Sequence, residues 1–155
     1  MAVQVVVFLL GQEEYAMPID VVREITRLGE VNIIPNAPSY VCGLITIRGV
    51  EIPLIDLHVR FGSDPIKMTT ESLGSQENQN TFALITEVHG NHVGFAVDQL
   101  REVRILENIV PPPSLVTDPF IGGVVNLPDR IIIQLIPEQI LESDEVKELG
   151  QLISH

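Results

Sequence analysis

Short runs of β-branched and other apolar residues recur along the chain, each ending at a glycine, a proline or an asparagine. Runs of this length and composition are typical of an all-β barrel or sandwich. They predict strands over residues 3–10, 31–34, 44–47, 51–55, 82–87, 92–97, 103–106, 124–127 and 130–135. We therefore expect a mainly β protein.

Tight turns are predicted where two apolar runs are separated by a few polar residues. These turns are centred on Gly11, Arg48-Gly49, Gly90 and Pro128-Asp129, and glycine supplies positive φ where it is present. Helical patterns are brief. They predict one or two turns over 18–25, short helices over 56–61 and 137–141, and a last helix beginning near residue 143. The polar stretch 63–80 is interpreted as a surface loop, and 111–113 as a stiff polyproline spacer.

Two segments of the chain repeat. Residues 19–25 (IDVVREI) match 97–103 (VDQLREV) at an offset of 78, the separation of Asp20 from Asp98. Residues 43–47 (GLITI) match 123–127 (GVVNL) at an offset of 80. Repeats of this length indicate a duplicated module, not a solenoid. Two copies of one small barrel, with a binding groove between them, are therefore expected.

The charge balance restricts the partners of the protein. Aspartate and glutamate number 21 against 9 lysines and arginines, so the net charge is −12. Nucleic acid and anionic membrane surfaces are therefore poor partners. No apolar stretch reaches the length of a transmembrane span, so direct membrane insertion is not expected. The N-terminal apolar run lacks a basic start and is interpreted as a strand, and the single cysteine, Cys42, suits a reducing compartment. A cytoplasmic location is the expectation.

No catalytic or cofactor-binding pattern is found. Phosphate-binding glycine motifs are missing, so nucleotide binding is unsupported. His89 and His92 have no third ligand in sequence reach, and Cys42 near His58 is better explained as a small buried hydrophobe than as a nucleophile. The sequence therefore predicts a non-enzyme without metal or cofactor.

One hairpin carries a specific resemblance. Residues 43–57 (GLITIRGVEIPLIDL) closely resemble the signature of the CheW family of chemotaxis coupling proteins. The likeness extends upstream through 15–25 (YAMPIDVVREI) and 34–38, and downstream through 93–103, 120–124 and 129–130. The chain departs from the family pattern at Thr46, at Pro128-Asp129 and at the prolines of 111–113. The family's kinase and receiver-bearing relatives would need domains for which this chain has no room.

The resemblance implies a fold and a function. It implies a single CheW-like domain over 1–155, built as two intertwined five-stranded SH3-like barrels with short helices and a C-terminal helix. We expect the first lobe over about 15–75, the second over about 1–14 with 80–140, and the helix over 141–155. The implied function is a non-enzymatic adaptor in the cytoplasm, associated with membrane receptor arrays. It would join the cytoplasmic hairpin tip of chemoreceptors to the regulatory domain of the histidine kinase CheA.

Site residues are carried over by position. The receptor-binding candidates are Val22, Gly43, Arg48, Leu100 and Val103, and the kinase-binding candidates are Glu24 and Ile25. Simpler explanations stay open. The repeated pairs Arg23-Glu24 and Arg101-Glu102 can be exposed surface charge, Arg48 can tie the hairpin to its own protein, and Glu24 or Ile25 can belong to the core. Three other functions stay open at this point: a coupler of a twitching or gliding pathway, a small-molecule-binding double barrel, and a catalytic lobe that depends on a partner.

Overall fold

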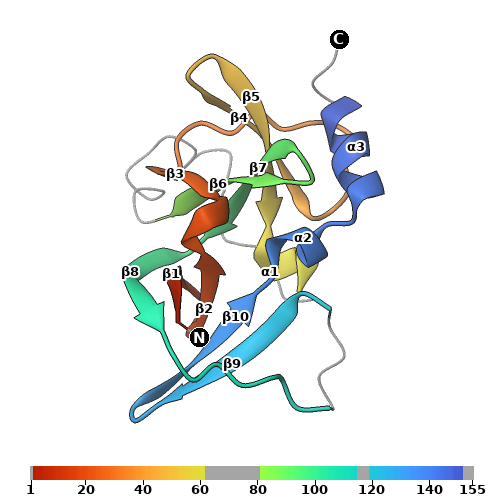
Figure 1. The fold of residues 1–155 in the computed structure, drawn as a ribbon. Coiled ribbons are helices and arrows are strands. Elements are labelled where there is room, and N and C mark those ends of the chain that lie inside the picture. The colour runs from red at the N-terminus through yellow and green to blue at the C-terminus, as the bar shows by residue number, and fades with distance from the viewer. Residues whose placement is uncertain (1, 62–80, 115–118, 152–155) are drawn as a thin grey trace.

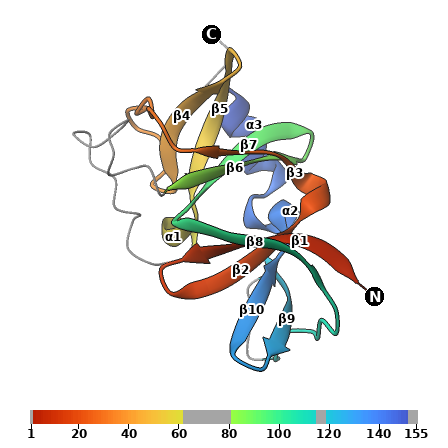
Figure 2. The same cartoon turned by 90° about the vertical axis from the view of Figure 1, so that its left-hand side faces the viewer.

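The strands of this protein form two five-stranded sheets. A computed structural model describes residues 2–61, 81–114 and 119–151. The first sheet, which we call the terminal lobe, has the order β8-β1-β2-β10-β9, and the second, the central lobe, has the order β3-β6-β7-β5-β4. Figures 1 and 2 show the two sheets as separate halves of the molecule, with α3 lying against the central lobe. The strands are β1 Val3–Leu10, β2 Glu13–Pro18, β3 Val22–Arg27, β4 Val41–Ile47, β5 Val50–Asp56, β6 Phe82–Val88, β7 Asn91–Val97, β8 Gln99–Leu106, β9 Ile121–Leu127 and β10 Arg130–Leu135.

The lobes are intertwined copies of one unit. The chain leaves the terminal lobe after β2 to build β3, β4 and β5, adds β6 and β7, and returns as β8 beside β1. Each lobe contains one parallel pair of strands at the equivalent position of its sheet, β2 with β10 and β5 with β7. The offset found in the sequence maps the strand order of one sheet onto that of the other. The prediction of a mainly β fold with two intertwined five-stranded units is confirmed.

The limits that we expected for the lobes differ from the sheet membership. Strands β6 and β7, which cover 82–97, lie in the central lobe and not with 1–14. Strand β2 pairs with β1 across a tight turn, so it belongs to the terminal lobe although it starts the region assigned to the other lobe. The reason is strand exchange, because each lobe takes its first hairpin from one repeat and its other strands from the other. Residues 62–80, which include most of the predicted surface loop, and 152–155 lie outside the described residues.

Two local predictions differ from the structure. One or two helical turns were expected over 18–25, and the structure has one 3-10 turn, η1 Ile19–Val21, directly after Pro18, while the rest of this range is strand β3. The strand expected over 31–34 is only a bridge between Asn32 and Leu44. Strand β3 contains a β-bulge between Val22 and Glu24.

The predicted turns are present, and two of them share one geometry. Arg48 and Gly49 have φ of 54° and 81°, and His89 and Gly90 have 51° and 79°. Positive φ at both central residues is what a type I′ hairpin turn requires. The β9–β10 turn cannot copy this geometry, since Pro128 fixes its own φ near −65°. The departure from the family pattern at this turn therefore gives the terminal lobe a different hairpin tip.

Three apolar clusters form the core. One lies within the central lobe and includes Ile52 and Ile85, and one lies within the terminal lobe and includes Val7 and Ile132. The third and largest is shared between the lobes and the C-terminal helices. Burial of its aliphatic side chains is the main force that joins the two lobes.

The helices are short and cover this shared cluster. Helix α1 Leu57–Arg60 begins at Asp56, whose carboxylate accepts the His58 and Val59 amides, as a helix N-cap does. Helix α2 is Pro137–Ile140 and α3 is Ser143–Gln151, which buries Val146 and Leu149. The helices predicted at these places are confirmed within the described residues. Across that same part of the chain, no helix has the length and apolarity needed to span a membrane.

An ion pair fastens α3 to α1. The Arg60 guanidinium donates to the Glu145 carboxylate at 2.8 Å and to the Ile140 carbonyl at 2.8 Å. It also lies 4.8 Å from the centre of the Tyr40 ring, whose hydroxyl donates to Glu145. The C-terminal helix is therefore held by polar contacts as well as by its two buried side chains.

Candidate functional site

The predicted signature residue Arg48 lies at the tip of the β4–β5 hairpin, with its side chain 83% exposed. Its guanidinium donates to the Glu24 carboxylate at 2.7 Å. Arg48 was predicted for the receptor and Glu24 for the kinase, so the structure brings one residue from each set together. The exposed guanidinium keeps most of its five donors for another carboxylate or for carbonyl groups.

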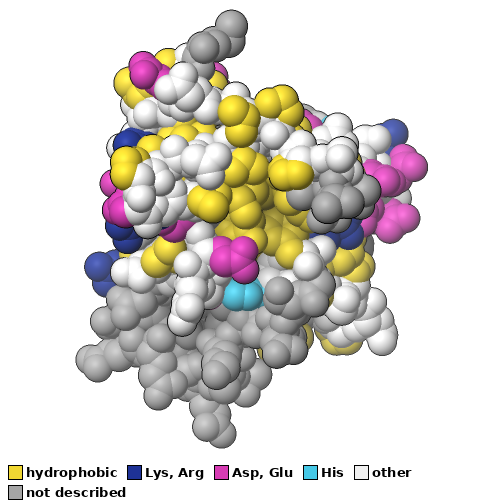
Figure 3. Space-filling view, turned by 90° about the horizontal axis from the view of Figure 1, so that it is seen from below, with side chains coloured by type: hydrophobic (Ala, Val, Ile, Leu, Met, Phe, Trp, Pro, Cys, Tyr) yellow, Lys and Arg dark blue, Asp and Glu magenta, His cyan; other side chains and the backbone are white. Residues whose placement is uncertain are grey.

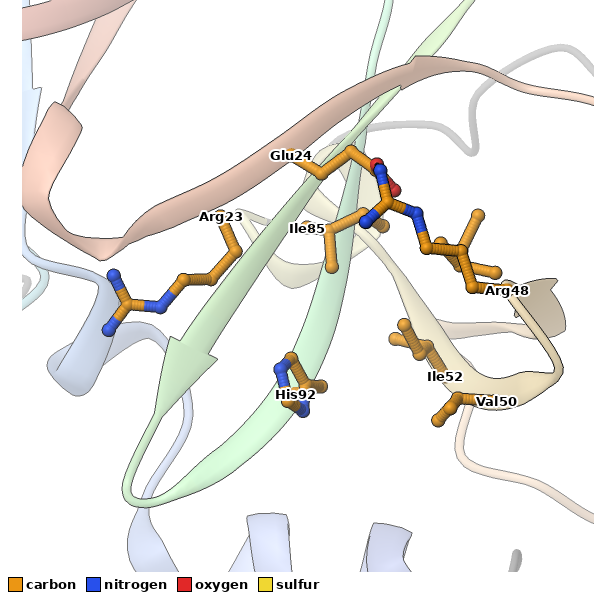
Figure 4. Close-up of a pocket in the computed structure, with 8 residues that line it drawn as sticks. Arg23, Glu24, Arg48, Val50, Ile52, Ile85 and His92 are labelled. Atoms are coloured by element: carbon orange, nitrogen blue, oxygen red, sulfur yellow. The ribbon is translucent and has the colours of Figure 1, made fainter.

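An open pocket of about 210 Å³ lies beside this ion pair. Aliphatic side chains form its base, and charged or ionisable groups stand around it (Figure 4). The Arg23 guanidinium points away from that of Arg48, which reaches the Glu24 carboxylate. The lining residues are Arg23, Glu24, Ile47, Arg48, Val50, Ile52, Ile85 and His92. The arrangement suits an apolar side chain next to a polar or acidic group.

Sequence reasoning missed most of this pocket. Val50 was seen only as part of the signature hairpin, His92 only as the start of a strand and a rejected metal ligand, and Arg23 only as part of a repeated charged pair. The signal that could have found Val50 is its place directly after the Arg48-Gly49 turn. No local signal places His92 there, because β7 reaches the pocket through long-range pairing with β5.

Two equivalent β-bulges orient the other predicted residues. In β3 the bulge makes Arg23 the extra residue, and in β8 it makes Arg101 the extra residue. Across the bulge, Ile25 pairs with Leu84 and Leu100 with Phe8, and both of these partners are buried in the shared cluster. Paired residues on adjacent antiparallel strands share a face.

Four apolar residues from the two lobes therefore face the same side as the shared cluster. They are Val22 and Ile25 on β3, and their repeat equivalents Leu100 and Val103 on β8. We call them the edge-strand residues. Val22 and Leu100 pack against the shared cluster. Ile25 and Val103 are 36% and 51% exposed.

Glu24 lies on the opposite face of β3. It pairs with Ile85, which belongs to the cluster inside the central lobe. In a regular strand Val22 and Glu24 would share a face, and the bulge separates them. The two predicted kinase residues, Glu24 and Ile25, are consequently divided between the pocket side and the side of the shared cluster.

Gly43 is buried and does not form part of the surface. A Cβ atom there would lie 2.3 Å from the Asn32 carbonyl oxygen and 2.9 Å from the Val31 side chain. Its repeat equivalent Gly123 has the same role, with a Cβ position 2.4 Å from Ile109. Gly43 therefore lets the chain after β3 approach β4, and any effect it has on binding is transmitted through this packing.

The terminal lobe holds a counterpart of the Arg48–Glu24 pair. Glu102, the equivalent of Glu24, accepts a hydrogen bond at 2.5 Å from Arg130, and Arg104 donates to it as well. Burial alone would raise the pKa of Glu102, but these two guanidinium groups hold it below the usual range. Arg130 is only 15% exposed, against 83% for Arg48. The two lobes therefore differ in this pair, since the guanidinium of Arg48 is far more accessible than that of Arg130.

The described residues offer little for catalysis or metal binding. Burial raises the pKa of the Cys42 thiol to about 12, so the reactive thiolate is disfavoured. His89 bonds the carbonyl oxygens of Glu138 and Leu141. Within residues 2–61, 81–114 and 119–151, no three His, Cys, Asp or Glu side chains are grouped as metal ligands would be.

Hydrophobic side chains are also gathered on the surface. On the face seen from below in Figure 1 they occupy the middle, and charged side chains lie mainly around the margin (Figure 3). An apolar surface with a polar margin is a common form of protein-binding site.

Comparison with known proteins gives a consistent result. The family model described as the CheW-like domain matches residues 4–145. A chemotaxis protein CheW of Klebsiella aerogenes is 32% identical over 90% of this chain and 82% of its own length. One from Treponema pallidum is 31% identical over 96% of this chain and 88% of its own. The crystal structure of the scaffolding protein TtCheW from Thermoanaerobacter tengcongensis superposes with a TM-score of 0.78 at 30% identity, covering 94% of this chain and 96% of that one.

Proposed function

Because the chain belongs to the CheW-like domain family, we propose that it is a non-enzymatic adaptor that couples chemoreceptors to the histidine kinase CheA in chemotaxis signalling. It would act in the cytoplasm, at the membrane arrays in which such receptors gather. The relatives named chemotaxis protein CheW and the solved scaffolding protein support this function. An adaptor needs surfaces for two partners, and β3 offers two faces of different character.

The observation that carries the proposal is the set of edge-strand residues. Val22 on β3 and its repeat equivalent Leu100 on β8 pack against the shared cluster from different lobes, and Val103 lies exposed on the same face of β8. A receptor's cytoplasmic tip is a helical hairpin, and an amphipathic helix binds by laying its apolar face on such a surface. We assign Val22, Leu100 and Val103 to this contact.

Arg48 would complete the receptor site from the hairpin tip. Its fork of donors fits a carboxylate or several carbonyl oxygens, which a lysine ammonium cannot match in geometry. Gly43 would contribute indirectly, by keeping β4 and its hairpin in position under residues 31–32.

The kinase regulatory domain would bind on the pocket side of β3. Glu24 faces this side, and the pocket next to it has an aliphatic base. Ile25, exposed on the other face of the strand, would extend the kinase contact around the edge of β3. The Arg48–Glu24 ion pair then lies where the two partner surfaces meet.

The test is whether both partners bind at once. Purified protein is titrated with the CheA regulatory domain and with a receptor cytoplasmic fragment, separately and then with the other partner already bound. Saturable binding of each, and a ternary complex in gel filtration with light scattering, are expected. Failure to bind either partner, or complete competition between them, would contradict the coupling function.

A matched pair of variants makes the assignment specific. Arg48→Lys keeps the charge and loses the planar fork, so it should weaken receptor binding by about tenfold and leave kinase binding within about twofold of wild type. Arg27→Lys makes the same chemical change at the far end of β3, outside both proposed contacts. If the two variants weaken receptor binding equally, Arg48 has no special role.

A further inference from the structure

The connection from the central lobe back to the terminal lobe is a single residue, Asp98, between β7 and β8. Its backbone amide donates to the Leu9 carbonyl at 3.1 Å. One oxygen of its carboxylate accepts a hydrogen bond from the Gly11 amide, in the β1–β2 turn. Asp98 therefore fixes the crossover against the first hairpin of the terminal lobe.

The same carboxylate oxygen also binds a histidine from the other lobe. His58 lies on α1, directly after β5, and its Nε2 is 2.8 Å from the Asp98 carboxylate. A carboxylate only accepts, so Nε2 carries the proton and donates it. The His58 amide is bonded to the N-cap Asp56, so the ring is held at its base. The histidine is 18% exposed and the aspartate 30%. A continuous polar connection runs from α1 to the β1–β2 turn.

The repeat places a second histidine at the corresponding junction. His89 is the equivalent of Gly11 at the offset of 78, and it lies in the β6–β7 turn of the central lobe. Its Nε2 is 2.9 Å from the Glu138 carbonyl and 3.0 Å from the Leu141 carbonyl, at α2 of the terminal lobe. Carbonyl oxygens accept, so this nitrogen is also a donor. In both junctions a histidine joins the first hairpin turn of one lobe to the helix that follows the second hairpin of the other.

From this geometry we infer that His58 and His89 are positioning residues that set the arrangement of the two lobes, and with it the spacing of the receptor-binding edge strands. The inference rests on the proposed function for its consequence, since Val22 and Leu100 come from different lobes. The shared apolar cluster supplies most of the adhesion between the lobes but is non-directional. Hydrogen bonds have direction, so the two histidine ties, together with the Arg60 contacts between α1 and the C-terminal helices, fix an orientation that apolar packing alone leaves adjustable.

Leucine and glutamine replacements separate this role from simple packing. His58→Leu and His89→Leu fill similar space without a donor, while His58→Gln and His89→Gln keep a side-chain N–H. Hydrogen exchange, which needs no partner, is measured first. His58→Leu should speed exchange in the β1–β2 turn and α1, and His89→Leu in the β6–β7 turn and α2. Each glutamine variant should stay close to wild type.

Receptor affinity is the second measurement. Loss of one hydrogen bond to a charged group corresponds to roughly tenfold in an equilibrium constant, so the His58→Leu affinity for the receptor fragment should fall by up to about tenfold. The acceptors of His89 are uncharged carbonyl groups, so His89→Leu should lower receptor affinity by less, roughly threefold. Kinase binding on the pocket side of β3 should stay within about twofold of wild type, because that contact lies in one lobe.

The outcomes are distinct. Unchanged exchange in the tied segments, or equal losses of receptor affinity in the leucine and glutamine variants, would overturn the inference. Faster exchange throughout the molecule would show a general loss of stability, and would also overturn it. If the wild-type protein binds no receptor, the proposed function fails. Hydrogen exchange in the tied segments of the leucine and glutamine variants then decides by itself whether the histidines fix the arrangement of the two lobes.

Discussion

At the scale of single residues, Arg48 combines an exposed side chain, which we propose for the receptor site, with a backbone conformation that most residues avoid. Its φ of 54° belongs to the left-handed region, and glycine adopts this region without steric cost. An arginine in this conformation therefore carries a small conformational strain. Replacing it with glycine removes the side chain and this strain together.

The first prediction uses this property. Arg48→Gly should leave the melting temperature unchanged or slightly raised, because glycine suits the turn and the lost ion pair is exposed. Receptor affinity should fall by at least about tenfold, since the guanidinium is gone. Thermal unfolding and titration with the receptor fragment check the two parts. Normal receptor binding by this variant would remove Arg48 from the receptor site.

The second prediction concerns Gly43, which packs against residues 31–32 and does not lie at the receptor surface. Gly43→Ala should lower the unfolding free energy by about 2–4 kcal/mol, because backbone at 2.3 Å from the new Cβ has to move. Gly29→Ala is the matched control, since nothing lies within 4 Å of a Cβ there. Urea unfolding of both variants measures the difference. Equal stability of the two variants would show that residues 31–32 can move away from the new Cβ with little loss of free energy.

Single residues also show what the sequence can and cannot predict. Arg48 at a hairpin tip could be predicted, because a two-residue turn between apolar strands fixes its place. The burial of Gly43 could not, since it depends on the bridge between Asn32 and Leu44, a tertiary contact that the strand pattern of the two segments does not specify. The Arg48–Glu24 pair was also missed, because the sheet that holds both residues forms by long-range pairing.

At the scale of elements, the β-bulge of β3 decides which partner each residue can reach. It puts Val22 and Glu24 on opposite faces although they are two residues apart. One or two helical turns were expected over 18–25, because Pro18 is suited to the first turn of a helix. A bulge and a helical turn produce the same local spacing, and only pairing with β6 distinguishes them.

The third prediction tests this separation. Val22→Lys should weaken receptor binding by more than tenfold, since a charge would meet the apolar face of the receptor helix. Kinase affinity should change little. Glu24→Ala should weaken kinase binding and alter receptor affinity by less than about fivefold, because the ion pair it breaks is exposed at Arg48. Both variants are titrated with each partner after their melting temperatures are matched. Parallel losses of both affinities would mean that the strand presents a single surface.

The C-terminal helix gives the fourth prediction, through the Glu145 carboxylate. Burial alone would raise the pKa of Glu145, but the Glu142 amide and the Arg60 guanidinium outweigh it and hold the pKa below its usual range. A depressed pKa in the folded state stabilises the protein above the unfolded-state pKa, and this stabilisation is lost as the pH falls through the folded-state value.

Wild type should therefore exceed Glu145→Gln in unfolding free energy by about 1–3 kcal/mol at neutral pH. The difference should shrink as the pH is lowered below about 4. Urea unfolding of the two proteins across this range measures it, and the comparison cancels the effect of the other carboxylates. A difference that stays constant with pH would show that the Arg60–Glu145 pair contributes little.

At the scale of the whole molecule, the duplication was the most informative feature of the sequence. The matches of Asp20 with Asp98 and of Gly43 with Gly123 correctly indicated two equivalent sheets. The limits of the lobes were not predictable in the same way, because a repeat shows which segments are equivalent and not which copy they pair with. Which copy each hairpin pairs with depends on tertiary packing, above all on the shared apolar cluster.

The last prediction follows from this exchange. Since each lobe contains strands from both repeats and the largest apolar cluster spans both, the lobes should unfold together in one transition. The two tyrosines provide a reporter in each lobe, Tyr15 on β2 and Tyr40 before β4. Single-tyrosine variants should give coincident urea transitions by fluorescence.

Two core variants test the coupling between the lobes. Ile52→Ala and its equivalent Ile132→Ala each remove a side chain from the cluster inside one lobe only, and each should lower the unfolding free energy by about 2–5 kcal/mol. If the protein is one cooperative unit, either change moves both reporters equally. A variant that shifts only the tyrosine of its own lobe would show that the lobes are independently stable, and the histidine ties would then join two separate folding units.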